Sequence, residues 1–129
     1  MPKNSRQLLL LAHGSRQEQW AHPFELVRDL IQRQHPGLGV RLAFLEFMQP
    51  SLHEALNEAG HQGIEQVLIA PLFLGAGGHL QRDIPEIAQA VQAHHPALKI
   101  EIAPPAGDDA GVIEALAAYA ARNIPNAGA

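Results

Sequence analysis

The sequence predicts a three-layer α/β fold, in which a four-stranded parallel sheet carries helices on both of its faces. Two observations predict it. Apolar runs alternate with amphipathic stretches along the chain, and the apolar runs are nearly continuous. A continuous apolar strand is typical of a sheet that is covered on both sides, which is where parallel strands occur. The expected strands are residues 7–12, 40–46, 65–70 and 98–103.

A helix is expected after each strand. These helices are residues 17–34, 50–60, 81–94 and 108–122. In the first of them, apolar side chains recur every three or four positions, which predicts one buried helix face. They are Trp20, Phe24, Val27, Leu30 and Ile31. Ser15 is expected to cap the start of this helix, with Glu18 completing a capping box.

Length and composition limit the class of protein. A chain of 129 residues suits a single domain over residues 1–129, with a frayed tail at 123–129. The absence of cysteine excludes disulfides and thiolate metal sites. A net charge of −4 without a basic stripe argues against nucleic acid as a partner. No apolar stretch suits a bilayer or a signal peptide, so no membrane partner and a cytoplasmic location are expected.

Two histidines follow two of the predicted strands. His13 closes the apolar run 8–12, and His79 follows the run 67–74 and a loop that contains Gly75, Gly77 and Gly78. The carboxyl ends of parallel strands form the ligand-binding edge of such a sheet. An imidazole there can hold a metal ion or move a proton near neutral pH. We therefore expect His13 and His79 to point into one cleft.

A carboxylate is expected at the same edge, because Glu46 ends the second predicted strand. Two neutral imidazoles and one carboxylate suit a divalent first-row metal, and the carboxylate can also accept protons. The catalytic candidates are therefore His13, His79 and Glu46, of which the histidines are the metal ligands.

Polar and flexible residues around the histidines are candidates for substrate binding. The glycines allow close approach of the backbone to a ligand, and arginine near a helix start can bind a carboxylate through two hydrogen bonds. These candidates are Ser15, Arg16, Gly77, Gly78 and Arg82.

Taken in order, three fragments of the chain resemble the small sirohydrochlorin cobaltochelatases, which are short CbiX-type class II chelatases related to sirohydrochlorin ferrochelatase. The fragments are residues 11–15 (Leu-Ala-His-Gly-Ser), Glu46 with residues 49–52 (Gln-Pro-Ser-Leu), and residues 71–85 from Pro71 through Gly78 and His79 to Pro85. The resemblance spans roughly residues 6–122.

This resemblance implies a chelatase fold and a lyase that inserts Co²⁺, or else Fe²⁺ or Ni²⁺, into sirohydrochlorin, a polycarboxylate tetrapyrrole used for cobalamin or siroheme. The metal is then a substrate, and no permanently bound cofactor is implied. By position, His13 and His79 match the histidines that handle metal, and Glu46 matches an assisting acid. Because the chain equals one half of the longer two-lobed chelatases, a homodimer with the cleft between its subunits is implied.

Two other functions compete with this one. A histidine phosphatase also places His-Gly after its first strand, but that chemistry uses an arginine directly before the histidine, and Ala12 stands there. A non-catalytic carrier of divalent metal needs a metal site and no turnover. The long glycine-bearing loop favours a bulky ligand over a bare ion.

Overall fold

The computed structural model describes residues 5–125, and it confirms the predicted α/β fold. The strands are β1 (Arg6–Ala12), β2 (Gly39–Phe44), β3 (Gln66–Pro71) and β4 (Lys99–Ile102). They form one sheet in the order β2-β1-β3-β4, and every neighbouring pair is parallel. All carboxyl ends of the strands therefore lie at one edge of the sheet.

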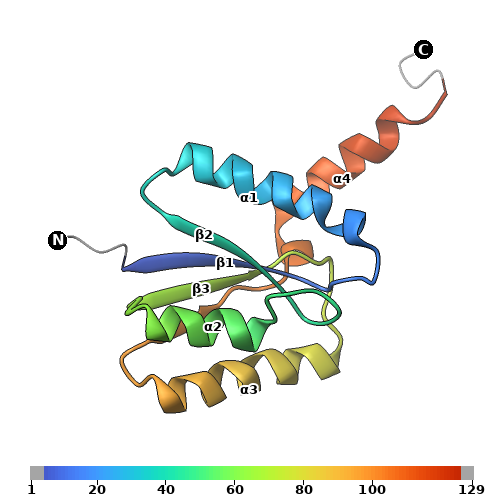
Figure 1. Ribbon diagram of the computed structural model, residues 1–129. Coiled ribbons are helices and arrows are strands. Elements are labelled where there is room, and N and C mark those ends of the chain that lie inside the picture. The colour runs from blue at the N-terminus through green and yellow to red at the C-terminus, as the bar shows by residue number, and fades with distance from the viewer. Residues whose placement is uncertain (1–4, 126–129) are drawn as a thin grey trace.

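The helices form layers on both sides of this sheet. A short 3-10 turn, η1 (Glu18–Ala21), precedes α1 (His22–Gln34), and the chain continues through α2 (Leu52–His61) and α3 (Gly78–His94). A second short turn, η2 (Ala106–Asp108), leads into α4 (Ala110–Arg122). Figure 1 shows α1 on one side of the sheet, α2 and α3 on the other, and α4 pointing away from the body. No helix within residues 5–125 is long and apolar enough to cross a membrane.

The core consists of two clusters, one on each face of the sheet. Successive side chains of a strand point to opposite faces, so Leu9 and Leu11 join the cluster beneath α2 and α3. Leu10 and Ala12 join the cluster beneath α1, together with Phe44. This division explains why β1 is apolar at every central position.

The first helix differs from the prediction. The expected helix 17–34 is split into η1 and α1. Trp20, Phe24 and Ile31 do pack against the core, but Val27 and Leu30 are 38% and 48% exposed, so their predicted burial is wrong in this single chain. α1 covers only part of its side of the sheet, which leaves one flank of the helix without a neighbour.

Other corrections concern how elements begin and end. The capping box predicted for Ser15 and Glu18 is wrong, because Ser15 Oγ accepts from Gln17 N–H at 3.1 Å. A capping box is instead formed at α2 by Ser51 and Glu54. β2 ends at Phe44 rather than at residue 46.

The start of α3 and the predicted tail also need comment. α3 begins at Gly78 rather than at residue 81, so His79 lies in its first turn and not in the preceding loop. Of the tail predicted to be frayed, residues 126–129 lie outside the described residues. Asn123 still donates its backbone N–H to the carbonyl of Ala120 at 3.1 Å.

Candidate functional site

The loop that carries His13 is fastened to the loop that follows β2. The carbonyl oxygens of Ala12 and His13 accept hydrogen bonds from the backbone N–H groups of Leu45 and Glu46, each at 3.0 Å. The next residue, Gly14, has a φ of +96°, and a Cβ added there would lie 1.8 Å from the Glu46 carbonyl oxygen. Only glycine permits this approach. The backbone position of His13 is therefore set by β1 and by the loop after β2.

The His13 side chain is exposed at the carboxyl edge of the sheet and lies against one aromatic ring. Its centroid is 4.6 Å from that of Phe73, with 38° between the ring planes. Phe73 follows β3 and is only 7% exposed. The contact gives the imidazole one apolar wall and leaves the rest of the ring open to solvent or ligand.

His79 is held differently. Its side chain is 81% exposed, and its Nε2 lies 2.9 Å from Oδ2 of Asp83, four residues further along α3. A carboxylate that contacts one ring nitrogen of a histidine fixes the tautomer and orients the other nitrogen. Asp83 had no assigned role in the sequence analysis, although a separation of four residues on a helix predicts such a contact.

Glu46 shares the sheet edge, but its side chain does not complete a closed metal site. Its backbone N–H binds the His13 carbonyl, whereas its side chain is exposed. Within residues 5–125, no group of three or more His, Asp or Glu side chains is close enough to hold one metal ion together. One chain thus supplies separate potential metal ligands around the open carboxyl edge of the sheet.

A pocket lies on the Arg16 side of His13. It has a volume of about 630 Å³, and its lining includes Ser15, Arg16, Glu18, Phe47 and Met48. The Arg16 guanidinium lies 4.7 Å from the centroid of the exposed Phe47 ring. Phe47 has a φ of +68°, which is costly for a bulky residue and is typical of functional loops.

A second pocket lies on the Phe73 side of His13. It measures about 340 Å³ and is formed by the residues after β3 and β4 and by the first turns of α3. Its lining includes Phe73, Leu80, Ile84, Ile102 and Pro105. His13 therefore stands between an arginine-bearing pocket and a largely apolar one.

The remaining substrate candidates flank the second pocket. Gly77 precedes α3 and Gly78 is its first residue, and a Cβ at either position would meet nothing within 4 Å. Both glycines thus face open space beside the pocket. Arg82 is exposed on the following turn of α3. Within residues 5–125, the space beside the two glycines is open, which suits a ligand with a large surface.

Comparison with known proteins decides the family. The sequence pattern of the CbiX family matches residues 7–123. The chain belongs to the CbiX family. The match includes both histidines, Glu46 and every substrate candidate.

Relatives and solved structures agree with this family. A sirohydrochlorin cobaltochelatase from Sulfurisphaera tokodaii is 34% identical over 109 residues, which are 84% of this chain and 86% of the relative. The crystal structure of a CbiX protein from Marinobacter aquaeolei VT8 has a TM-score of 0.78 and 32% identity, covering 91% of this chain and 95% of that one.

A longer neighbour has a different extent. The sirohydrochlorin chelatase SirB from Bacillus subtilis subspecies spizizenii, solved in complex with cobalt, has a TM-score of 0.71 and 25% identity. The likeness covers 91% of this chain but only 49% of SirB. The CbiX domain described here thus corresponds to about half of that chelatase.

Proposed function

We propose that this CbiX-family chain is a metal chelatase that inserts a divalent ion into sirohydrochlorin during tetrapyrrole biosynthesis. The observation that carries the proposal is a pair of imidazoles at one open sheet edge of a CbiX fold, His13 on Phe73 and His79 on Asp83. Co²⁺ is the first candidate, with Fe²⁺ and Ni²⁺ as further substrates, since imidazole suits all of them. The metal is consumed as substrate rather than retained as a cofactor.

The reaction exchanges one metal ion for two protons of the pyrrole nitrogens. His13 and His79 bind the incoming ion and replace part of its water shell. Glu46, whose carboxylate is exposed next to the His13 loop, accepts protons that leave the ring. Because metal binding to imidazole competes with protonation, the proposed reaction slows at acid pH.

The ring itself is held by its carboxylates and by its flat apolar surface. Arg16 and Arg82 bind carboxylates, and Ser15, Gly77 and Gly78 offer a hydroxyl and accessible backbone. The two pockets beside His13 receive the edges of the ring. Neither pocket can enclose a whole tetrapyrrole, so the open edge must be part of the binding surface.

A second copy supplies the facing wall of this open edge. The chain is one lobe, corresponding to about half of SirB, and a symmetric pair is the commonest assembly of identical chains. The proposed active form is therefore a homodimer whose interface borders the cleft, acting in the cytoplasm.

The test is anaerobic incubation of the purified protein with sirohydrochlorin and Co²⁺, Fe²⁺ or Ni²⁺ in turn, following the absorbance of the ring. We expect insertion faster than the spontaneous rate for at least one metal. Metal binding without any acceleration would contradict the proposal and support a metal carrier instead.

A further inference from the structure

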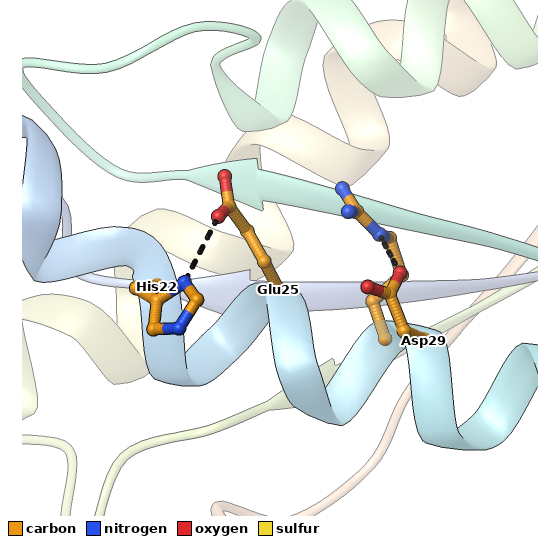
Figure 2. Close-up of polar contacts among 4 residues, drawn as sticks. His22, Glu25 and Asp29 are labelled. Carbon is orange, nitrogen blue, oxygen red and sulfur yellow. Dashed lines mark hydrogen bonds and ion pairs between the residues drawn. The ribbon is translucent and has the colours of Figure 1, made fainter.

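The site described above uses two of the eight histidines of the chain, and the others differ in their surroundings. Figure 2 shows His22 on α1, whose Nδ1 lies 3.8 Å from Oε1 of Glu25 and whose side chain is 68% exposed. Such a ring belongs to a solvated helix surface. His61 and His95 are different, because their rings contact each other with centroids 4.8 Å apart and planes at 81°.

This histidine pair lies at the opposite end of the molecule from the carboxyl edge of the sheet. His61 is the last residue of α2, and His95 directly follows α3. Figure 1 shows these two helices side by side, each leading back to the start of a strand. Along α3, the 16 positions from His79 to His95 span about 24 Å. The pair therefore cannot share an ion with the carboxyl edge.

Gly60 lets the His95 ring lie directly on α2. A Cβ added at Gly60 would lie 2.6 Å from Nδ1 and 2.7 Å from Cδ2 of His95, so any other residue would displace the imidazole. Glycine weakens a helix. At this position it gives the ring the room it needs, directly beside His61.

The hydrogen bond that His95 makes sets its tautomer. Its Nε2 lies 2.8 Å from Oδ1 of Asn57, one turn before Gly60 on α2. An amide oxygen only accepts, so Nε2 carries the hydrogen, and the neutral ring keeps a lone pair on Nδ1. Histidines that bind metal ions are commonly held in this way, with the second ring nitrogen donating to an oxygen of the protein.

The end of α3 does not require this arrangement, because α1 ends in the same way without it. His35 and His95 have nearly the same backbone angles, with φ of −134° and −132° and ψ of 70° and 72°. Gln32 and Gln92, each three residues before the histidine, donate to the carbonyl of the leucine three residues after it, at 2.7 and 3.1 Å. Yet the His35 side chain is exposed. The contacts of His95 with α2 are thus an addition to a common helix ending.

We propose that His61 and His95 form a second metal site, which binds a borderline divalent ion such as Ni²⁺ or Zn²⁺ through Nδ1 of His95 and one ring nitrogen of His61. Imidazole suits these ions, and the exposed His61 ring can turn toward Nδ1. Within residues 5–125 no third His, Asp or Glu joins the pair, so water completes the coordination. A hollow of about 300 Å³, lined by Gly60, Gly63 and His95, gives room for that water.

An ion at this site joins the ends of α2 and α3. It binds the folded chain, in which the two imidazoles are neighbours, in preference to the unfolded chain, and it therefore stabilises the fold. The ion is retained rather than consumed. The inference does not depend on the chelatase chemistry proposed above.

Calorimetric titration with Ni²⁺ alone tests the site. The protein is the full chain carrying His13→Ala and His79→Ala, purified without a polyhistidine tag, so that the carboxyl edge contributes no imidazole. We expect one Ni²⁺ per chain. Adding His61→Ala, or His95→Gln in a separate protein, should weaken binding at least about tenfold, the scale for loss of a metal contact. Thermal unfolding without metal shows that each variant is folded.

Two controls use histidines outside the pair. His35→Ala removes the imidazole from the equivalent end of α1, and His94→Ala removes the one next to His95 in sequence. Each should leave the Ni²⁺ affinity within about twofold, since neither ring is a ligand. An unchanged affinity in the His61→Ala protein overturns the site. A tenfold loss in the His94→Ala protein overturns the assigned pair, and the same loss with His35→Ala means that Ni²⁺ binds scattered surface histidines.

Two further measurements separate the site from the carboxyl edge. Ni²⁺ should raise the Tm of the chain that lacks His13 and His79 by several degrees, whereas Mg²⁺, which prefers oxygen ligands, should not. A Tm that Ni²⁺ leaves unchanged overturns the link between α2 and α3. In the otherwise native chain, His61→Ala should leave metal insertion into sirohydrochlorin unchanged, and a slower insertion would overturn the independence of the two sites.

Discussion

The two histidines of the sheet edge are held in opposite ways. His13 sits in a short loop whose backbone is bonded to the loop after β2, with its ring against the nearly buried Phe73. His79 projects from the first turn of α3, is 81% exposed, and contacts the carboxylate of Asp83. One imidazole is positioned by the backbone and a packed ring, and the other by a single carboxylate on its own helix.

From this difference we infer a division of labour, in which the two histidines have different roles in metal delivery. A rigidly placed ligand can define where the ion must stand relative to the ring, because its geometry is supported by surrounding contacts. An exposed ligand at the start of a helix can reach into solvent and bind the ion first. We therefore expect changes around His13 to affect the chemical step, and changes around His79 to affect metal capture.

The largest effect is expected from Gly14→Ala, which attacks the support of His13. The new Cβ would stand 1.8 Å from the Glu46 carbonyl oxygen at a φ of +96°, so the two loops must separate. We expect a loss of stability on the order of 3 kcal/mol, as for other strained backbone changes, together with loss of activity. Thermal unfolding and the insertion assay measure both.

Gly37→Ala is the matched control for Gly14→Ala. A Cβ there meets nothing within 4 Å, and its φ lies outside the left-handed region. It should leave activity unchanged and stability unchanged or slightly increased. Equal losses of stability and activity in the two variants would show that the close contact between the His13 loop and the loop after β2 has no special role.

Next in size is the contrast between His13→Ala and His79→Ala. We expect the first to reduce the maximal insertion rate about 100-fold or more, and the second to raise the metal concentration needed by roughly 10- to 100-fold, the scale for changes in metal coordination. Steady-state rates at varied Co²⁺ separate the two effects.

The control for the two histidine variants is His53→Ala, on the exposed surface of α2. His61 is a poorer control, since its ring centroid is 4.8 Å from that of His95. Indistinguishable kinetics for His13→Ala and His79→Ala would contradict the division of labour.

The sequence predicted the strands and the sheet edge well, because continuous apolar runs and strand ends are local signals. It could not predict that Val27 and Leu30 are exposed, since their spacing is that of a buried helix face and the width of sheet that α1 covers is not a local signal.

In the site, too, local sequence signals predict where residues lie along the chain but not which distant residues they contact. His13, His79 and Glu46 follow from their places after strands, whereas the contact of His13 with Phe73 joins residues 60 positions apart and has no local signature. The capping box was assigned to Ser15 and Glu18, although Ser51 and Glu54 show the same spacing. After Ser15 the chain forms a 3-10 turn rather than an α-helix, and the Ser15 hydroxyl accepts from the N–H of Gln17, two residues on, instead of from that of Glu18.

A smaller effect is expected from Asp83→Asn, which sharpens the comparison by leaving His79 in place without its charged partner. Asp83 is a positioning residue, so Co²⁺ affinity should fall by about 10-fold while the maximal rate changes little. The visible absorption of bound Co²⁺, titrated without substrate, reports this directly. Glu86→Gln, exposed on the same helix, is the control. An unchanged Co²⁺ titration would remove Asp83 from the site.

Arg16→Gln tests the pocket on the His13 side. Arg16 lies over Phe47 and lines the pocket of about 630 Å³, so its removal should weaken binding of the substrate carboxylates. We expect KM for sirohydrochlorin to rise several-fold with little change in kcat, because this binding is uniform through the reaction. Arg33→Gln, at the exposed end of α1, should leave both constants unchanged. A fall in kcat alone would place Arg16 in the chemistry instead.

The smallest effect is expected from Glu58→Gln, which perturbs the molecule far from both histidines. Arg41 Nη1 lies 2.7 Å from Glu58 Oε1, and this hydrogen bond and the charge of Arg41 lower the pKa of Glu58 below its ordinary value of 4.5. A carboxylate with a lowered pKa in the folded state stabilises the fold above its unfolded pKa, and that contribution is lost as the pH falls through the folded value. The variant should therefore lower Tm by no more than about 2 °C at pH 7, since exposed pairs contribute little. The gap should close as the pH falls through the lowered pKa of Glu58, and thermal scans at pH 7 and at acid pH measure it. Insertion kinetics at pH 7 should match those of the native chain, and a change in either the rate or the metal dependence would mean that the two histidines respond to general stability rather than to their separate supports.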